Sequence, residues 1–172
     1  MEIRNATKKD LDSIMQIEFA SFIPGIQEER IVFENRIKLC GESFLVFEDE
    51  NKKVFGYLCA ERMSKIPERV NELELGHFPN VNKNGSVLYI SSFAIFPEYR
   101  GNGTGSYVWE QSLNFLKNLK GIKTIVLLVN ESWTGAHHIY EKSGFYEICR
   151  LPSFFYAEDD SYTDGILMQK NI

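Results

Sequence analysis

The pattern of hydrophobic and polar positions along the chain predicts helices and strands in alternation. Apolar residues recur three and four positions apart, as in amphipathic helices, in segments 7–20, 27–39, 103–119 and 134–142. Strand-like runs occupy segments 2–6, 43–47, 54–60, 87–96, 124–129, 145–149 and 166–168. From residue 87 onwards strands alternate with helices, so crossover connections and some parallel pairing are expected. The hairpin at 43–60 makes the sheet mixed, and we expect an α/β fold.

One long polar stretch, residues 63–85, interrupts this pattern. It contains Pro67, Gly76, Pro79 and Gly85 and exceeds the usual length of a connection between elements. Long loops of this kind often form binding loops or lids. Because strand-like patterning resumes directly after it, we interpret 63–85 as an insertion on the substrate side of a single domain that spans 1–172.

Composition narrows the class of protein. Of the 172 residues, 24 are acidic and 19 are basic, which gives a formal net charge of −5. Nucleic acids and anionic membranes both require a basic surface, so neither is expected as a partner. The longest strongly apolar run, 125–129, is far too short to span a membrane, and the N-terminus shows no signal peptide. The three cysteines form no CxxC pair, so reduced thiols and a cytoplasmic location are expected.

A glycine-rich turn joins the strand over 87–96 to the helix that follows it. Its sequence is Arg100-Gly101-Asn102-Gly103-Thr104-Gly105. Glycines allow a sharp turn that presents several N–H groups outward, and a helix N-terminus behind them completes an anion-binding site. Arg100 adds a charged donor, and the combination fits a pyrophosphate. The alternative from these residues alone is a turn that only reverses the chain. No Gly-Lys-Ser/Thr follows, so the segment is not a P-loop.

The turn resembles the Gln/Arg-x-x-Gly-x-Gly/Ala signature of the GNAT superfamily of acyl-CoA-dependent N-acetyltransferases. A second segment, Ala136-His137-His138-Ile139-Tyr140-Glu141-Lys142-Ser143-Gly144-Phe145, is similar to the family's downstream motif and stands in the right order. The order of the elements matches the family across almost the whole chain. The resemblance implies a GNAT fold, a twisted mixed sheet of about seven strands with splayed fourth and fifth strands, flanked by about four helices.

The resemblance also implies acetyl-CoA as the donor, with no metal. The pantetheine arm would lie against the backbone of Phe93, Ala94 and Ile95, and the pyrophosphate on residues 100–105. Trp133 stands where the family often carries an asparagine that contacts the cofactor, and either Trp133 or Asn130 is a candidate to replace it. His137, one helical turn before Tyr140, is a further candidate to approach the cofactor.

Acetyl transfer to an amine needs a proton acceptor, an acid for the leaving thiol and a donor for the carbonyl oxygen. Tyr140 matches the tyrosine that many family members place beside the CoA sulfur, and it is the expected acid. The alternative is a core-facing helical pair of Ala136 and Tyr140. The histidines and the glutamate that serve as bases in two branches of the family are absent. Tyr89 and Ser91, which simple alternation places on one strand face with Phe93, are candidates to hold a proton-relaying water, unless they are ordinary strand residues.

The first two helices and the insertion are expected to flank the acceptor. Candidate contacts for an amine with an apolar body are Glu28, Glu29, Phe33 and Phe78. We favour a small primary amine, either a polyamine or arylalkylamine-like, that attacks acetyl-CoA directly in a ternary complex, because the insertion should narrow the groove that a peptide needs. The tail over 154–168 is instead similar to protein N-terminal acetyltransferases, so acetylation of protein N-termini or lysines is the alternative. An acyl-CoA-binding module with little catalysis is the alternative from another class, and a homodimer is left open.

Overall fold

The computed structural model describes residues 1–67, 73, 76, 81–157 and 159–172. Its strands are β1 (Glu2–Asn5), β2 (Phe44–Glu48), β3 (Val54–Met63), β4 (Val87–Ile95), β5 (Thr124–Asn130), β6 (Tyr146–Tyr156) and β7 (Tyr162–Asn171). Its α-helices are α1 (Leu11–Ser21), α2 (Arg30–Leu39), α3 (Thr104–Leu116) and α4 (Thr134–Lys142). Short 3-10 turns are η1 (Lys8–Asp10), η2 (Pro24–Ile26) and η4 (Pro97–Tyr99).

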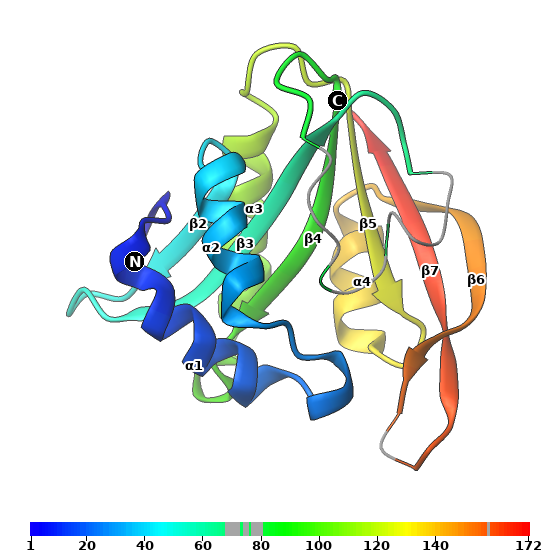
Figure 1. Ribbon diagram of the computed structural model, residues 1–172, viewed down its shortest axis with the longest axis horizontal. Coiled ribbons are helices and arrows are strands. Elements are labelled where there is room, and N and C mark those ends of the chain that lie inside the picture. The colour runs from blue at the N-terminus through cyan, green and yellow to red at the C-terminus, as the bar shows by residue number, and fades with distance from the viewer. Residues whose placement is uncertain (68–72, 74–75, 77–80, 158) are drawn as a thin grey trace.

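Within the described residues, seven strands form one sheet in the order β1-β2-β3-β4-β5-β7-β6 (Figure 1). Neighbouring strands run antiparallel except β4 and β5, which are parallel. Helices α1 and α2 cover one face of the sheet, and α3 and α4 cover the other. The predicted mixed sheet, with four flanking helices, is confirmed. None of the helices in the described ranges is long and apolar enough to cross a membrane.

The strands β4 and β5 separate along their length. Their pairing begins at Val87 with Thr124 and ends at Ile90 with Leu127, yet β4 continues to Ile95 and β5 continues beyond Leu127. The predicted splay is therefore confirmed. Among the residues that the structure describes, no strand pairs with the half of β4 that follows Ile90 on its β5 side, so its backbone groups there need another partner. The diverging halves of the two strands are here called the wedge.

A bulge at Ser91 changes which side chains of β4 share a face. Ile90 and Ser92 pair with consecutive residues of β3, and Ser91 between them has no partner. One extra residue reverses the alternation beyond it. The expectation that Tyr89 and Phe93 share a face is therefore wrong. Phe93 packs into the core on the α3 side of the sheet, whereas Tyr89 lies in a cluster on the other face.

Helix α2 begins at Arg30, later than the predicted start at residue 27. The backbone of Gln27 and Glu29 is extended. Between them, the N–H of Glu28 donates to the carboxylate of Glu18 on α1, with the two atoms 2.8 Å apart. A tertiary contact that the helical pattern does not reveal therefore lies at the start of this helix.

The last two strands are also longer than predicted. β6 runs to Tyr156, beyond the expected end at Cys149, and β7 already begins at Tyr162. β6 is an edge strand whose residues are mostly exposed, and its pairing with β7 shifts register twice. Few of its positions therefore carry the apolar alternation that marks a half-buried strand.

Candidate active site

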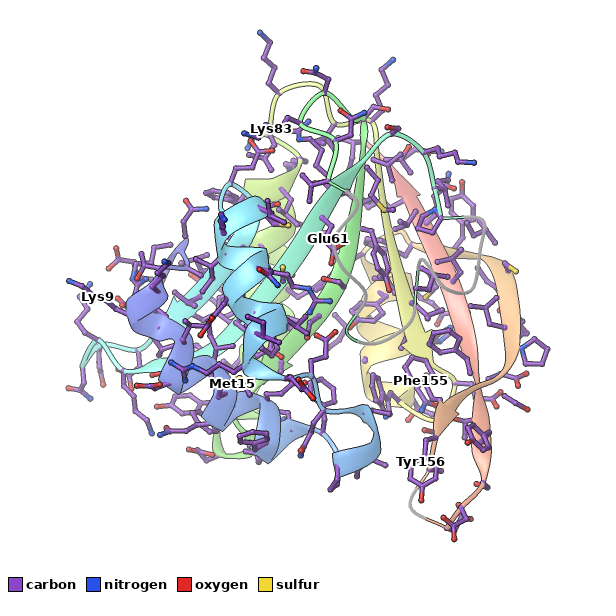
Figure 2. The ribbon with its side chains drawn as sticks, in the orientation of Figure 1. Lys9, Met15, Glu61, Lys83, Phe155 and Tyr156 are labelled. Atoms are coloured by element: carbon purple, nitrogen blue, oxygen red, sulfur yellow. The ribbon has the colours of Figure 1, made fainter. Side chains whose placement is uncertain are left out.

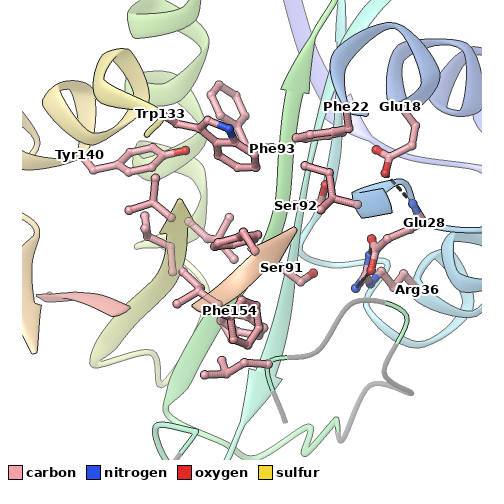
Figure 3. Close-up of a pocket in the computed structure, with 18 residues that line it drawn as sticks. Glu18, Phe22, Glu28, Arg36, Ser91, Ser92, Phe93, Trp133, Tyr140 and Phe154 are labelled. Atoms are coloured by element: carbon pink, nitrogen blue, oxygen red, sulfur yellow. Dashed lines mark hydrogen bonds and ion pairs between the residues drawn. The ribbon is translucent and has the colours of Figure 1, made fainter. Parts of the chain in front are cut away.

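Two adjacent cavities occupy the wedge. The first, here called the outer groove, runs along the second half of β4, the glycine turn and α4. The second, here called the inner cavity, lies between β4, β5, the end of α1, the start of α2 and the C-terminal part of β6 (Figure 3). The residues that line both are Phe22, Phe93, Trp133 and Tyr140. The two cavities therefore border each other at these four side chains.

The outer groove brings together most of the residues predicted to bind the cofactor. These are Phe93, Ala94, Ile95, Arg100, Gly101, Gly103, Gly105 and Trp133. Ser21 and Phe22, at the end of α1, also line it and were missed, because a helix terminus gives no chemical signal in the sequence. The groove thus runs from an unpaired strand edge to a glycine turn. The strand edge suits a ligand arm that carries amide groups, and the turn suits an anionic end.

The glycine turn owes its shape to two residues in the left-handed region. Gly101 has φ 84° and Gly103 has φ 86°, values that L side chains rarely adopt. A Cβ at either position would meet nothing within 4 Å, so the space around the turn is open. Helix α3 starts directly after it, at Thr104, and its first N–H groups lack intrahelical acceptors. The turn can therefore hold an anionic group.

The other polar residues of this segment shape the turn. The side-chain oxygen Oδ1 of Asn102 accepts hydrogen bonds from the Thr104 N–H at 3.2 Å and the Thr104 hydroxyl at 2.6 Å, and neither side chain lines the groove. The Arg100 guanidinium donates to the carbonyl oxygen of Ile95 and to the hydroxyl of Ser21. The polar side chains of this segment therefore hold turn, strand and helix α1 together.

Tyr140 lies where the two cavities meet. Its ring packs against Trp109 with the centroids 4.5 Å apart, and its hydroxyl points into the wedge (Figure 3). Burial raises the pKa of Tyr140 above its usual value, so the hydroxyl keeps its proton at neutral pH. Tyr140 is thus both a core residue and a protonated group beside the wedge, and its role as acid stays a prediction.

The structure separates the three other cofactor candidates. Trp133 lines both cavities and packs between Phe22 and Phe155, with centroid distances of 5.7 and 5.4 Å. The side-chain oxygen Oδ1 of Asn130 accepts hydrogen bonds from Ser132 and from Thr163 on β7, and Asn130 lines neither cavity. His137 also lies outside both, with its Nδ1 3.6 Å from Glu141 Oε2, and it lines a separate hollow that α4 shares with β6 and β7. The expected contact of His137 with the cofactor does not fit this position, because α4 turns Ala136 and Tyr140 towards the groove.

A buried ionic network forms one wall of the inner cavity. Arg36 is 1% exposed and contacts two carboxylates, pairing through two nitrogens with Glu28 and through Nε with Glu61 at 3.2 Å. The N–H of Gly76, from the insertion, donates to Glu28 at 3.0 Å. Glu28 and Arg36 line the cavity, whereas Glu61, on β3 (Figure 2), is fully buried and does not. Two carboxylates around one guanidinium leave a net negative charge beside the cavity, which favours a cationic ligand.

A further carboxyl group, Glu18 on α1, was missed as a site residue. It is 1% exposed, accepts a hydrogen bond from the Tyr57 hydroxyl and lines the inner cavity (Figure 3). Burial raises the pKa of Glu18 to about 7. The sequence does carry a signal, because Glu18 falls on the apolar stripe of the predicted helix, where a carboxylate is unusual.

The two predicted relay residues both line the inner cavity. Tyr89 is buried, and this burial together with the nearby Glu61 carboxylate raises the pKa of its hydroxyl. Ser91, at the bulge, lies with its hydroxyl 3.5 Å from the carbonyl oxygen of Cys59. Their joint role in holding a water stays a prediction.

Among the predicted acceptor contacts that the structure describes, Glu28 lines the inner cavity. Glu29 is exposed and lines neither cavity. Phe33 is fully buried against Tyr57, with ring centroids 5.4 Å apart, because α2 turns this residue towards the sheet. Both expectations therefore disagree with the structure. Phe78 lies outside the described residues, but Leu73, from the same insertion, does line the cavity.

Among the residues that the structure describes, no three histidine, cysteine or carboxylate side chains gather in a way that could hold a metal ion.

The family model described as "Acetyltransferase (GNAT) family" matches residues 11–145. An N-alpha-acetyltransferase of Sulfolobus acidocaldarius is 27% identical over 161 residues, which cover 94% of this chain and 89% of that protein.

Solved structures with similar folds include the loading GNATL domain of CurA from Lyngbya majuscula. Its TM-score is 0.83 at 15% identity, over 99% of this chain and 96% of that one. A GNAT superfamily phosphinothricin acetyltransferase from Sinorhizobium meliloti, solved in complex with AcCoA, gives 0.75 at 18% identity, over 99% of this chain and 88% of that one. At these identities the two structures establish the fold alone.

Proposed function

The chain belongs to the GNAT acetyltransferase family, and from that premise we propose that it transfers the acetyl group of acetyl-CoA to the N-terminal α-amino group of a protein or peptide. The acceptor class is supported by similarity to the N-alpha-acetyltransferase of Sulfolobus acidocaldarius, which extends over nearly the whole length of both chains. The small amine favoured from the sequence alone becomes the second candidate. That expectation depended on an insertion of which much lies outside the described residues.

The outer groove supports acetyl-CoA as the donor. The pantetheine arm carries amide groups that can bond to the strand edge over Phe93, Ala94 and Ile95, where the backbone groups of Phe93 and Ile95 face the β5 side and β4 has no strand partner among the described residues. Its pyrophosphate would lie on the glycine turn, at the N-terminus of α3. The thioester then reaches the junction of the two cavities, beside Tyr140.

The inner cavity supports an ammonium as the acceptor. Its lining includes Glu18, Glu28 and Arg36, and Arg36 also pairs with the buried Glu61, so negative groups outnumber positive ones here. The apolar side chains of Leu128 and Phe154 also line the cavity. A cation with an attached apolar group would be attracted to this combination. Both candidate acceptor classes enter as ammonium ions, so the cavity's charge is consistent with either.

The reaction is proposed as a direct attack in a ternary complex. The acceptor nitrogen, once deprotonated, adds to the thioester carbon, and the C–S bond breaks. Tyr140, protonated and buried, gives its proton to the departing sulfur. Binding the donor along β4 and the acceptor in the inner cavity would supply the alignment that such an attack needs.

The test compares kcat/KM for acetyl transfer among peptides that differ in their first residue, polyamines and arylalkylamines. We expect transfer to at least one class of peptide N-terminus, located by mass spectrometry on the α-amino group and absent from peptides with a blocked N-terminus. Faster transfer to a small amine than to every peptide would assign the acceptor to the second candidate. Tight acetyl-CoA binding without CoA release for any amine would favour a binding module.

A further inference from the structure

A hydrogen-bonded chain leads from the inner cavity to a buried carboxyl group. We propose that Ser92, Tyr57 and Glu18 carry the proton that the incoming ammonium loses, with Glu18 as the terminal acceptor. This inference rests on the proposed acetyl transfer to an amine. It supplies the proton route for which the sequence suggested only Tyr89 and Ser91.

The three groups come from three elements and are in direct contact. Ser92 Oγ on β4 lies 3.0 Å from Tyr57 Oη on β3, and the Tyr57 hydroxyl donates to Glu18 Oε2 on α1. A tyrosine hydroxyl has one hydrogen to donate, and the ionised Glu18 takes it, so Ser92 is the donor in the bond between the two hydroxyls. The two hydrogen bonds therefore point in the same direction, from Ser92 through Tyr57 to Glu18.

Ser92 and Glu18, the two ends of this hydrogen-bonded chain, both line the inner cavity but differ in how far they are buried. Ser92 is half-buried, and its side chain lines the cavity (Figure 3). Glu18 is 1% exposed, and its second oxygen accepts the N–H of Glu28 at 2.8 Å. An ammonium in the cavity can thus reach the Ser92 hydroxyl directly or through one water, and in the proposed route Glu18, although it also lines the cavity, receives the proton through Tyr57.

The surroundings of Glu18 fit the role of acceptor. Burial is the largest influence and raises the pKa of Glu18 to about 7, and the Glu28 carboxylate acts in the same direction. The Tyr57 hydroxyl, the Glu28 N–H and the Arg36 guanidinium act in the opposite direction. An α-ammonium has a pKa of about 7.7–8.0, so a proton passes between the two groups at little cost in free energy. An ordinary glutamate, with a pKa of about 4.3, would hold the proton far less well.

The protons balance as follows. An ammonium nitrogen loses two protons as it becomes an amide. The first moves to Ser92 as the Ser92 proton moves to Tyr57 and the Tyr57 proton moves to Glu18. The N–C bond then forms, the C–S bond breaks, and the sulfur takes the proton of Tyr140, which the second nitrogen proton replaces. Glu18 finally releases its proton to solvent, so the products are an amide, the CoA thiol and one proton.

Variants of matched shape separate this role from a structural one. Glu18→Gln keeps an oxygen for the Glu28 N–H but cannot accept a proton. Tyr57→Phe keeps the ring that packs against Phe33 but removes the hydroxyl that joins Ser92 to Glu18. Asp12→Asn removes an acid from the exposed side of the same helix, where its side chain is 81% exposed, and serves as the control. A structural Glu18 would affect folding but would leave the pH dependence of turnover unchanged.

The experiment measures kcat against pH with acetyl-CoA and an N-terminally free peptide. In parallel, the Glu18 carboxyl is titrated by difference infrared spectroscopy between the wild type and Glu18→Gln. We expect kcat of the wild type to fall as pH drops below about 7. In Glu18→Gln and Tyr57→Phe, kcat should be roughly 100-fold lower and this acidic limb should disappear, with the Kd for acetyl-CoA unchanged. Asp12→Asn should keep the wild-type profile.

Three outcomes overturn the proposal. One is a Glu18 carboxyl that titrates below about pH 5, near its ordinary pKa. Another is Glu18→Gln with the wild-type kcat and acidic limb. The third is a wild type that acetylates no amine at all, which overturns the relay together with the proposed function.

If peptides fail as acceptors but a small amine is acetylated, the profiles of kcat against pH are measured with that amine. The proposed acceptor class then fails, whereas the relay is still tested.

Discussion

The guanidinium of Arg100 donates two hydrogen bonds to the carbonyl oxygen of Ile95, from Nε at 3.0 Å and from a terminal nitrogen at 2.8 Å. The terminal nitrogen also lies 2.9 Å from the hydroxyl of Ser21. The side chain that the sequence offers as a phosphate ligand therefore ties the glycine turn to the end of β4 and to α1. These three elements form one wall of the outer groove, so Arg100 holds the groove in shape.

Replacing Arg100 should weaken the binding of acetyl-CoA. Arg100→Lys keeps the charge but loses the planar fork that serves Ile95 and Ser21 together, so we expect the KM for acetyl-CoA to rise about tenfold. Arg30→Lys, at a half-exposed ion pair with Asp12, is the control and should leave KM unchanged. An unaltered KM in Arg100→Lys would show that the groove keeps its shape without this contact.

Tyr140→Phe should lower turnover selectively. The buried ring remains packed against Trp109, while the sulfur loses its proton donor, so we expect kcat to fall roughly 100-fold with little change in the KM for acetyl-CoA. Steady-state kinetics at several pH values measure both constants. Tyr107→Phe, on the exposed side of α3, should behave as the wild type. A kcat equal to that of the wild type would remove Tyr140 from the acid's role.

Gly103→Ala should cost stability and donor binding together. The residue has φ 86°, and an alanine forced into this region costs about 1–2 kcal/mol. Gly121→Ala is a matched control, since Gly121 has φ 83° and open space around it but lies outside both cavities. Urea unfolding should show similar losses for the two variants, whereas isothermal titration should show weaker acetyl-CoA binding for Gly103→Ala alone. Equal affinities would mean that the turn does not contact the donor.

Arg36→Met should destabilise the fold strongly. It leaves the buried carboxylates of Glu28 and Glu61 without their guanidinium, and breaking a buried pair on one side typically costs about 3–5 kcal/mol. Arg30→Met removes a half-exposed ion pair and should cost less than about 1 kcal/mol. Chemical denaturation at neutral pH provides the comparison. Equal losses in the two variants would mean that the buried network contributes no more than a surface pair.

The stability of the wild type relative to Glu18→Gln should depend on pH in a definite direction. The folded protein holds the Glu18 proton up to a pKa of about 7, whereas the unfolded chain releases it near the ordinary value of about 4.3. The contribution of Glu18 is therefore fully present below about pH 4.3 and is lost as pH rises to about 7. The difference in unfolding free energy should fall by about 3 kcal/mol across this interval. A difference that stays constant with pH would show that Glu18 has its ordinary pKa in the fold.

The sequence by itself determined the parts of this protein that depend on local chemistry. The mixed sheet and its helices follow from hydrophobic periodicity. The glycine turn follows from residues that alone adopt positive φ readily, and Tyr140 follows from its place in a motif on a helix whose predicted bounds, 134–142, are those observed. The acidic residue on the apolar stripe of α1 was also visible, although its partners were not.

Only the tertiary structure decided which polar groups share a site. Tyr57 forms hydrogen bonds with Glu18, 39 residues away in the sequence, and with Ser92, 35 residues away, and no periodicity links such positions. The bulge at Ser91 reversed the face assignments of β4 beyond it, because an unpaired residue is a property of two strands together. Burial likewise raised the pKa of Glu18, since desolvation depends on every element packed around the carboxyl group. Sequence determines local conformation through steric and solvation preferences, whereas long-range packing brings distant groups together and sets their protonation.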